Sequence, residues 1–352
     1  MKSTKPLVAV DCDTLLYAST AACEERSIEV LHEPTGKTKE FKNRTEFKEL
    51  MRSKEKEITH DYKIIDQQFP QPIENALQIV KQRTEKILDN FSDCEVVLCA
   101  GDSDNFRMKL PYPTKYKKNR DTTLRPLLLK DVHSYFRRKY KAVMAQSHEV
   151  DDEVAILAYE ALRQGREGIV ISPDGDSRQF DGLKLGKYDY DYEACFPIKF
   201  MSPIRWTDGE FDSYGFPWTI MQAAVGDATD GLNPTYLPNK RYGEKGFYNE
   251  VKDMKSPEEL ALHLIKKYKE WFPSEFEYET WNGVKVKADW KFMLNLYWKG
   301  TTMKRERYKE PDFVEFIKEK ERQYGFDGSK IWEAFAKRKG LKYDSNQNTR
   351  TS

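Results

Sequence analysis

Long apolar runs are absent from this sequence, and cysteine and histidine are scarce. No stretch approaches the ~20 apolar residues of a membrane-spanning helix, so no membrane partner is expected. The five cysteines form no CxxC pair and the five histidines no HxH or HExxH motif. A zinc site is therefore not expected, and the thiols are expected to be reduced. The N-terminal MKSTKPLVAVD has no apolar signal-peptide segment, and together these absences predict a cytoplasmic protein.

Charge is balanced overall but unevenly distributed. The chain has 352 residues, with 59 Lys and Arg against 58 Asp and Glu, and a formal net charge of +1. Residues 105–141, however, contain twelve basic side chains and only two acidic ones. Such a segment can be a solvated face, but it is also typical of proteins that bind a polyanion, because cations steer and hold phosphates.

Carboxylates follow short apolar runs that read as buried parallel strands. The runs are at 7–10, 95–100 and 168–172, and the acids that end or follow them are Asp11, Asp102, Asp174 and Asp176. In an open α/β sheet the carboxyl ends of the strands line one crevice, so residues far apart in sequence converge there. Each acid alone also has a structural explanation, as a turn residue or a helix cap.

Two further acidic groups complete the pattern. One precedes and opens a helix predicted at 151–164, and the other lies in the segment GDATDG; they comprise Glu149, Asp151, Asp152, Asp227 and Asp230. An acidic first turn is stabilised by the helix dipole, and the second group can be a capped turn. Yet so many carboxylates in one crevice would repel one another unless cations neutralise them. Oxygen-only ligation suits Mg²⁺ or Mn²⁺, so the sequence predicts a site for two such ions and phosphodiester chemistry.

The remaining periodicity predicts an α/β fold with a mostly parallel sheet. Helices are expected at 73–90, 127–140 and 217–225. Residues 28–72 look like an insertion made of a hairpin and a charged helix, and the chain beyond about 250 reads as helical and rich in aromatic residues.

These residues resemble the 5′-nuclease (flap endonuclease-like) superfamily, which includes bacteriophage 5′→3′ exonucleases and the 5′-nuclease domain of bacterial DNA polymerase I. The resemblance is carried by the order of the acids, by YKKNRD at 116–121 and by GDATDG, and it covers about residues 5–250. It implies a PIN/FEN-like core at 1–225, with the insertion at 28–72 and a basic arch-like segment at 103–126. A helical part would follow at 226–342, and a disordered tail at 343–352.

The resemblance also implies roles for individual residues. A first metal site would be formed by Asp11, Asp102, Glu149 and Asp151, together with Asp152; a second by Asp174, Asp176 and Asp227, with Asp230 close by. Lys117 and Arg120 would neutralise the scissile phosphate, so that the residues acting directly in catalysis would be Asp11, Asp174, Lys117 and Arg120.

DNA would be bound by the arch-like segment and by a helix-hairpin-helix-like element. The residues implied are Arg107, Lys115, Tyr116, Lys117, Lys118, Arg120, Lys240, Arg241 and Lys245. Tyr116 would either stack on a terminal base or occupy an amphipathic surface position. The helix-hairpin-helix-like element departs from the family, because GLNPTYLPNKRYGEKGF lacks the first Pro-Gly turn, which puts its K⁺ site in question.

The implied activity is metal-dependent 5′→3′ cleavage of DNA at or near 5′ ends, as an exonuclease or flap endonuclease. The expected substrates are duplex or flap DNA and RNA–DNA hybrids at replication primers, in the host cytoplasm if the protein is encoded by a phage.

Two other functions remain open at this point. LVAVDCD also resembles haloacid-dehalogenase-like phosphatases, in which Asp11 would be the nucleophile, although Thr14 lies one place too early for that motif. A non-catalytic nucleic-acid-binding relative is the other alternative, although such a protein gains nothing from acidic residues beside DNA.

Overall fold

A six-stranded sheet forms the centre of the N-terminal half. The computed structural model describes residues 4–101 and 104–336. The strand order is β6-β5-β1-β7-β8-β9, with parallel pairing throughout except for the antiparallel edge strand β9. The strands are β1 (Leu7–Asp11), β5 (Glu95–Ala100), β6 (Val143–Met144), β7 (Gly168–Ile171), β8 (Lys184–Gly186) and β9 (Phe196–Pro197). The predicted α/β class, with a mostly parallel sheet flanked by helices, is confirmed.

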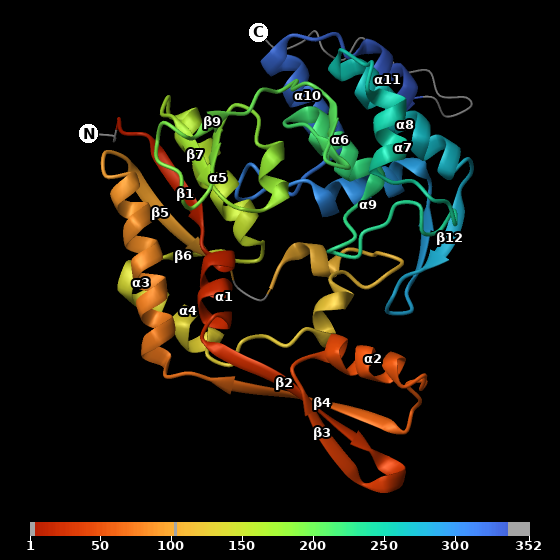
Figure 1. The fold of residues 1–352 in the computed structure, drawn as a ribbon. Helices are drawn as coiled ribbons and strands as arrows, with labels where there is room; N and C mark the ends of the chain where they lie inside the picture. The colour runs from red at the N-terminus through yellow and green to blue at the C-terminus, as the bar shows by residue number, and fades with distance from the viewer. Residues whose placement is uncertain (1–3, 102–103, 337–352) are drawn as a thin grey trace.

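Helices cover both faces of this sheet (Figure 1). Helices α1 (Asp13–Ala21), α3 (Ile73–Asn90) and α4 (Leu129–Tyr140) share a hydrophobic cluster with Val8 and Val10. The other face, with Leu7 and Ala9, packs against α5 (Val150–Arg163). Side chains of a strand alternate between faces, so each of these short runs is apolar throughout and buried on both sides.

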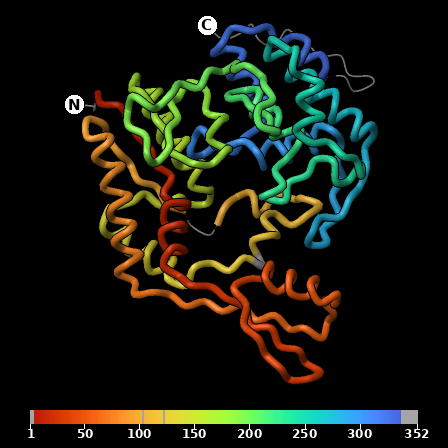
Figure 2. Tube along the Cα trace, in the orientation of Figure 1, coloured from red at the N-terminus to blue at the C-terminus, as the bar shows by residue number. Residues whose placement is uncertain are grey.

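The predicted insertion is a separate small α/β unit between α1 and α3. It contains β2 (Glu24–His32), β3 (Lys37–Phe41), β4 (Tyr62–Pro70) and helix α2 (Arg44–Ser53), with sheet order β3-β2-β4. The unit has its own cluster of apolar side chains and protrudes from the rest of the chain in Figure 2. The hairpin and the charged helix are confirmed, whereas β4 was not predicted, because its alternation is interrupted by polar residues.

The C-terminal part is mainly helical. It contains α6 (Phe216–Val225), α7 (Glu244–Val251), α8 (Pro257–Trp271), α9 (Trp290–Thr301), α10 (Phe313–Tyr324) and α11 (Ser329–Ala336). Two hairpins, β10 (Arg205–Thr207) with β11 (Glu210–Asp212) and β12 (Phe276–Glu279) with β13 (Lys285–Ala288), were not expected. Within the described ranges, no helix is both long and apolar enough to cross a membrane.

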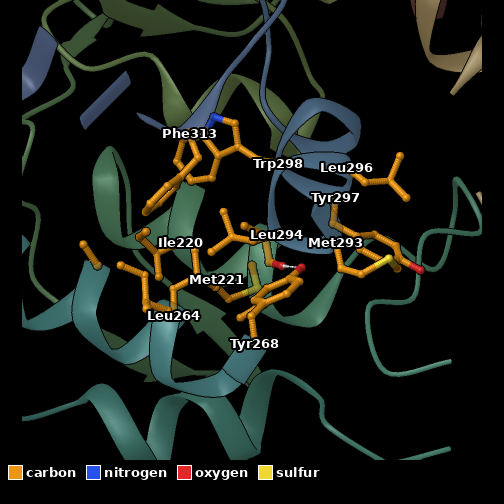
Figure 3. Close-up of a cluster of buried hydrophobic side chains, with 14 of the residues drawn as sticks. Ile220, Met221, Leu264, Tyr268, Met293, Leu294, Leu296, Tyr297, Trp298 and Phe313 are labelled. Carbon is orange, nitrogen blue, oxygen red and sulfur yellow. Dashed lines mark hydrogen bonds between the residues drawn. The ribbon is translucent and has the colours of Figure 1, made fainter. Parts of the chain in front are cut away.

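The largest cluster of buried side chains lies in this C-terminal part. Figure 3 shows side chains of α6, α8 and α9 meeting around Tyr268, whose hydroxyl donates to the backbone oxygen of Ala223 (2.8 Å). Helix α6 contributes Ile220 and Met221 to this cluster. Packing therefore places α6 with the helices that follow it, whereas the sequence grouped it with the core ending at residue 225. The predicted disordered tail, 343–352, lies outside the described residues.

Three short 3₁₀ helices connect these parts near the C-terminal edge of the sheet. They are η2 (Phe106–Lys109) and η3 (Lys118–Thr122) in the arch-like segment, and η4 (Gly175–Gln179) after β7; a fourth, η1 (Glu33–Thr35), lies in the hairpin of the insertion.

A buried charge cluster holds the C-terminal helices against the core. Asp181 is 1% exposed, and its carboxylate accepts hydrogen bonds from Arg305 (2.6 Å), Lys320 (2.8 Å) and Tyr324 (2.7 Å). Burial alone would raise the pKa of Asp181, but the charges of Arg305 and Lys320 outweigh it and lower that pKa to about 2. Burial, with repulsion from Arg305, lowers the pKa of Lys320 to about 8.

Replacing Asp181 by Asn should therefore destabilise the fold by about 3–5 kcal/mol at pH 7, because two buried cations lose their counter-ion. Chemical denaturation monitored by tryptophan fluorescence measures this change. Lys318→Ala, on the helix α10 that also carries Lys320, is the control. The ion pair of Lys318 with Glu315 is exposed, so its loss should cost under about 1 kcal/mol. Equal effects of the two substitutions would contradict the assignment.

Candidate metal centre at the C-terminal edge of the sheet

Asp11 ends the central strand and is buried at the edge where the parallel strands end. It is 3% exposed, and its oxygens accept hydrogen bonds from the backbone N of Asp13 (3.0 Å) and the hydroxyl of Ser172 (3.2 Å), which follows β7. Burial, with repulsion from Asp13 and Asp174, raises the pKa of Asp11 to about 7. The neighbouring strands therefore bring acidic groups together here, as their sequence positions predict.

Asp151, in the first turn of α5, lies amid these groups. Burial and the charges of Asp11, Asp174 and Asp176 raise its pKa well above the usual value. Its Oδ1 is buried and makes no hydrogen bond. An unpaired buried carboxylate oxygen is costly, so this atom indicates a place where a cation would be stabilising.

Asp176 and Asp227 form the next part of the cluster. Burial, together with repulsion from Asp174 and Asp227, raises the pKa of Asp176 well above its usual range. Burial and repulsion from Asp230 raise the pKa of Asp227. Both turns also have the local bonds of capped turns: Asp174 accepts from the backbone N of Asp176 (3.0 Å), and Asp227 from that of Thr229 (2.7 Å). The capped-turn explanation of these aspartates is therefore confirmed, and their role as metal ligands stays a prediction.

Glu149, which precedes α5, is surrounded by donors and cations. It accepts hydrogen bonds from Asn105 (3.1 Å), from the hydroxyl of Tyr116 (3.1 Å) and from the ammonium of Lys117. The guanidinium of Arg107 lies 3.4 Å away. Glu149 is therefore neutralised by protein cations in this structure.

The arch-like segment packs against the GDATDG loop rather than standing away from the core. Asp230 accepts hydrogen bonds from the hydroxyl of Tyr116 (2.7 Å) and from Arg120 (3.3 Å), and its carboxylate lies 3.3 Å from the ammonium of Lys117. The backbone N of Lys117 also donates to the backbone oxygen of Asp230 (2.8 Å). In Figure 1 this segment runs between α1 and the C-terminal part. Lys117 and Arg120 are therefore at the acidic cluster, as predicted.

Three predicted roles are wrong. Arg107 is fully buried, so it does not reach DNA; it instead forms a two-point ion pair with Asp152 (2.6 and 3.0 Å). Asp152 also accepts from the backbone N of Lys304 (2.7 Å), and with both oxygens engaged it is a support residue rather than a metal ligand. Tyr116 is 5% exposed and packs on Tyr112, so it neither stacks on a base nor lies on the surface.

The other predicted DNA-binding residues lie outside the carboxylate cluster. Lys118, Lys240 and Arg241 are exposed. Lys245, at the start of α7, lies over the ring of Trp206 (4.2 Å), and Lys115 over that of Trp281 (5.9 Å). These contacts leave their role in DNA binding a prediction.

Asp13 belongs to the cluster, although the sequence analysis did not select it. It accepts a hydrogen bond from the backbone N of Gly101 (2.8 Å). Burial and the charge of Glu149 raise its pKa. The sequence does carry a signal for it, because Asp13 follows Asp11 by two residues in VDCD, a spacing that also matches the phosphatase motif.

The donor chemistry fits divalent cations, although the carboxylates are gathered rather than tightly clustered. Among the residues that the structure describes, no three His, Cys, Asp or Glu side chains form a compact ligand set. Asp102, a predicted ligand, lies outside the described residues. Divalent cations would suit this site because its carboxylates are hard oxygen donors that repel one another. One of these oxygens, Oδ1 of Asp151, is buried without a hydrogen-bond partner.

Comparisons with known proteins give partial matches. No protein-family model and no curated protein matches the chain. A bacteriophage T5 protein co-crystallised with metal ions is 15% identical, with a TM-score of 0.40 over 74% of this chain and 79% of that one. The T5 5′-exonuclease with zinc bound is 17% identical, with a TM-score of 0.37 over 54% and 70%.

A third match is the bacteriophage T5 flap endonuclease in a complex with DNA and metal ions. It is 13% identical, with a TM-score of 0.34 over 55% of this chain and 84% of that one. The second and third of these neighbours are named as a 5′-exonuclease and a flap endonuclease.

Repulsion within the cluster should make an isosteric neutral substitution stabilising. In EDTA, the free energy of unfolding of Asp151→Asn should exceed that of wild type by an amount on the order of 1 kcal/mol. The substitution removes a carboxyl group whose pKa is raised in the folded state. Mn²⁺ should reverse the order by stabilising only the wild type. Thermal denaturation with and without metal measures both effects, and Asp93→Asn in an exposed loop is the control.

The same repulsion gives the wild type a distinct pH dependence in EDTA. The folded-state pKa of Asp11 is about 7, so the folded protein binds this proton more tightly than the unfolded chain does. Its contribution to stability should rise as the pH falls through 7 towards 4. For the preceding experiment, an Asp151→Asn protein that is less stable than wild type in EDTA would contradict the predicted repulsion among the carboxylates.

Proposed function

We propose that this protein is a divalent-metal-dependent nuclease that hydrolyses DNA phosphodiester bonds at or near 5′ ends. The observation that carries the proposal is that carboxylates from separate parts of the chain lie around Asp151. Carboxylates from the end of β1, the turn after β7 and the start of α5 raise one another's pKa, and Lys117 borders them. Such a cluster destabilises the folded chain unless it serves to bind cations.

The cluster has enough oxygen donors for two ions, Mg²⁺ or Mn²⁺. Asp11, Glu149 and Asp151, with Asp102, would hold the first; Asp174, Asp176 and Asp227 would hold the second, with Asp230 close by. When bound, such ions activate a water molecule and stabilise charge on the attacking and leaving oxygens of a phosphodiester.

The basic residues beside the cluster act on the substrate. The ammonium of Lys117 now pairs with Glu149 and Asp230, and the half-exposed Arg120 pairs with Asp230. When cations occupy the carboxylates, both side chains are placed to interact with phosphate oxygens and to stabilise the charge that develops on them. The exposed Lys118, Lys240 and Arg241 would hold the adjoining backbone phosphates.

The two alternatives fit the geometry less well. A phosphatase nucleophile must be accessible, whereas Asp11 is buried and hydrogen-bonded to Ser172. A non-catalytic binding protein would have no use for buried carboxylates that repel both DNA and one another.

Finer parts of the proposal follow from the motif resemblance. They are a 5′→3′ polarity, action on duplex, flap or RNA-primed DNA during replication, a cytoplasmic location and a phage origin. The long α6–α7 connection, with its exposed basic residues, would contact duplex DNA, and K⁺ is a further candidate ligand there.

The direct test is digestion of 5′-labelled duplex, flap and RNA-primed DNA. Cleavage with Mg²⁺ that is abolished by EDTA, releasing products from the 5′ end, is expected. Asp174→Ala should lose cleavage and retain DNA binding, because it removes an exposed ligand, whereas Asp189→Ala in an exposed loop should cleave as wild type does. Cleavage in EDTA, or normal turnover by Asp174→Ala, would contradict the proposal.

Lys117→Ala should lower the single-turnover cleavage rate by about 10²–10³-fold, because a cation close to the transition-state charge is lost. Its matched control is Lys118→Ala, the exposed neighbour, which should weaken DNA binding and leave the rate at saturating enzyme near wild type. A normal rate in Lys117→Ala would remove Lys117 from the mechanism.

A further inference from the structure

Five residues at the C-terminal end of α9 and just beyond it pack against the core that holds the acidic cluster, although they lie about 70 residues beyond the last predicted metal ligand. We call residues 300–304 the strap. Thr301, Thr302 and Met303 are each at most 3% exposed, and Lys304 is 8% exposed. Five backbone groups of the strap bond to side chains of the core, in two directions, while the backbone N of Thr302 still donates to the backbone oxygen of Trp298 on α9 (2.9 Å).

The first direction leads to the start of α5. Arg107 donates from Nε to the oxygen of Gly300 (3.0 Å) and from one terminal nitrogen to that of Thr302 (2.9 Å). The same guanidinium forms the two-point ion pair with Asp152 and lies 3.4 Å from Glu149. The backbone N of Lys304 completes this arm by donating to Asp152.

The second direction leads to the turn after β7. The backbone N of Met303 donates to the side-chain oxygen of Gln179 (2.8 Å), and the amide nitrogen of Gln179 donates to the oxygen of Thr301 (3.3 Å) and to Gln222 (3.4 Å). The amide nitrogen of Gln222 then donates to Oδ1 of Asp176. Both amides are at most 5% exposed.

We infer that the strap positions the carboxylates that bind metal, with Gln222 and Gln179 as positioning residues for Asp176, and Arg107 for Glu149. This inference rests on the proposed function of the same site. The two arms reach both predicted ion positions, so one segment of the C-terminal part fixes the geometry of the whole cluster.

Repulsion explains why such support is needed. Asp176 is repelled by the carboxylates of Asp174 and Asp227, so a freely rotating side chain would turn away from them. A donor fixed on Oδ1 selects one rotamer and leaves Oδ2 for a cation. Gln222 can hold that direction because its own amide is anchored through Gln179 to the backbone. Outer partners of metal ligands typically affect affinity by about 10–100-fold.

The test is the affinity of substrate-free protein for Mn²⁺, measured by isothermal titration calorimetry. Gln222→Leu keeps the volume of the side chain and removes its donor, and it should raise the dissociation constant at least ~10-fold. Thr219→Val is the matched control: Thr219 lies one turn earlier on α6, is equally buried, and donates to the backbone oxygen of Gly215 (3.0 Å). It should bind Mn²⁺ as wild type does.

A wild-type affinity in Gln222→Leu, or an equal loss in Thr219→Val, overturns the inference. If Gln222→Leu does not fold, Gln179→Met removes the preceding amide and should weaken binding in the same sense; unchanged affinity there also overturns it. Wild-type protein that binds no Mn²⁺ would overturn the proposed function as well, whereas strong wild-type binding with unaffected variants would remove only the role of the strap.

Discussion

Mutual repulsion of buried carboxylates is the constraint on which the rest of this structure depends. Asp11, Asp151 and Asp176 each have a raised pKa because they are buried and lie among like charges. Charges in a low-dielectric site interact strongly, so the chain must hold the acids together against their own field. It does so with cations on one side, Lys117 and Arg107, and with neutral amide donors on the other.

The two kinds of support have different consequences. The ion pair between Lys117 and Glu149 occupies a carboxylate oxygen, so under the proposed function a bound metal ion would compete with Lys117 for Glu149. A neutral donor such as Gln222 orients Asp176 without adding charge. The acidic cluster thus has charged partners that a metal ion could displace and neutral partners in the interior that it would leave in place, an arrangement that suits the proposed metal site.

The sequence predicted what depends on local pattern and missed what depends on distant packing. Short apolar runs followed by Asp located the sheet edge, because strand burial and strand ends are local properties. Glu149 and Asp152, three residues apart, looked equivalent, yet they differ. Asp152 is saturated by Arg107 and by the backbone of Lys304, and no local pattern connects a residue of α5 with one 152 positions later.

Tyr116 is a second residue whose position depends on contacts with distant parts of the chain. Its lysine neighbours predicted either a base-stacking or a surface position, but Tyr116 is buried in the aromatic core shared with the C-terminal helices. Asp13 was missed for a different reason, since its alternation with Asp11 was visible and was ascribed to another family.

The close approach of the strap to the core explains the glycine at its start. A Cβ on Gly300 would lie 2.4 Å from the hydroxyl of Tyr112, a distance that real structures do not tolerate. The same residue presents its backbone oxygen to Arg107. Any larger side chain would therefore push α9 away from the arch-like segment and lengthen the bond that fixes Arg107, and through it Asp152. The geometry of the acidic cluster is in this way coupled to the packing of helices that carry none of its carboxylates, which makes the C-terminal part a structural component of the cluster rather than a separable module.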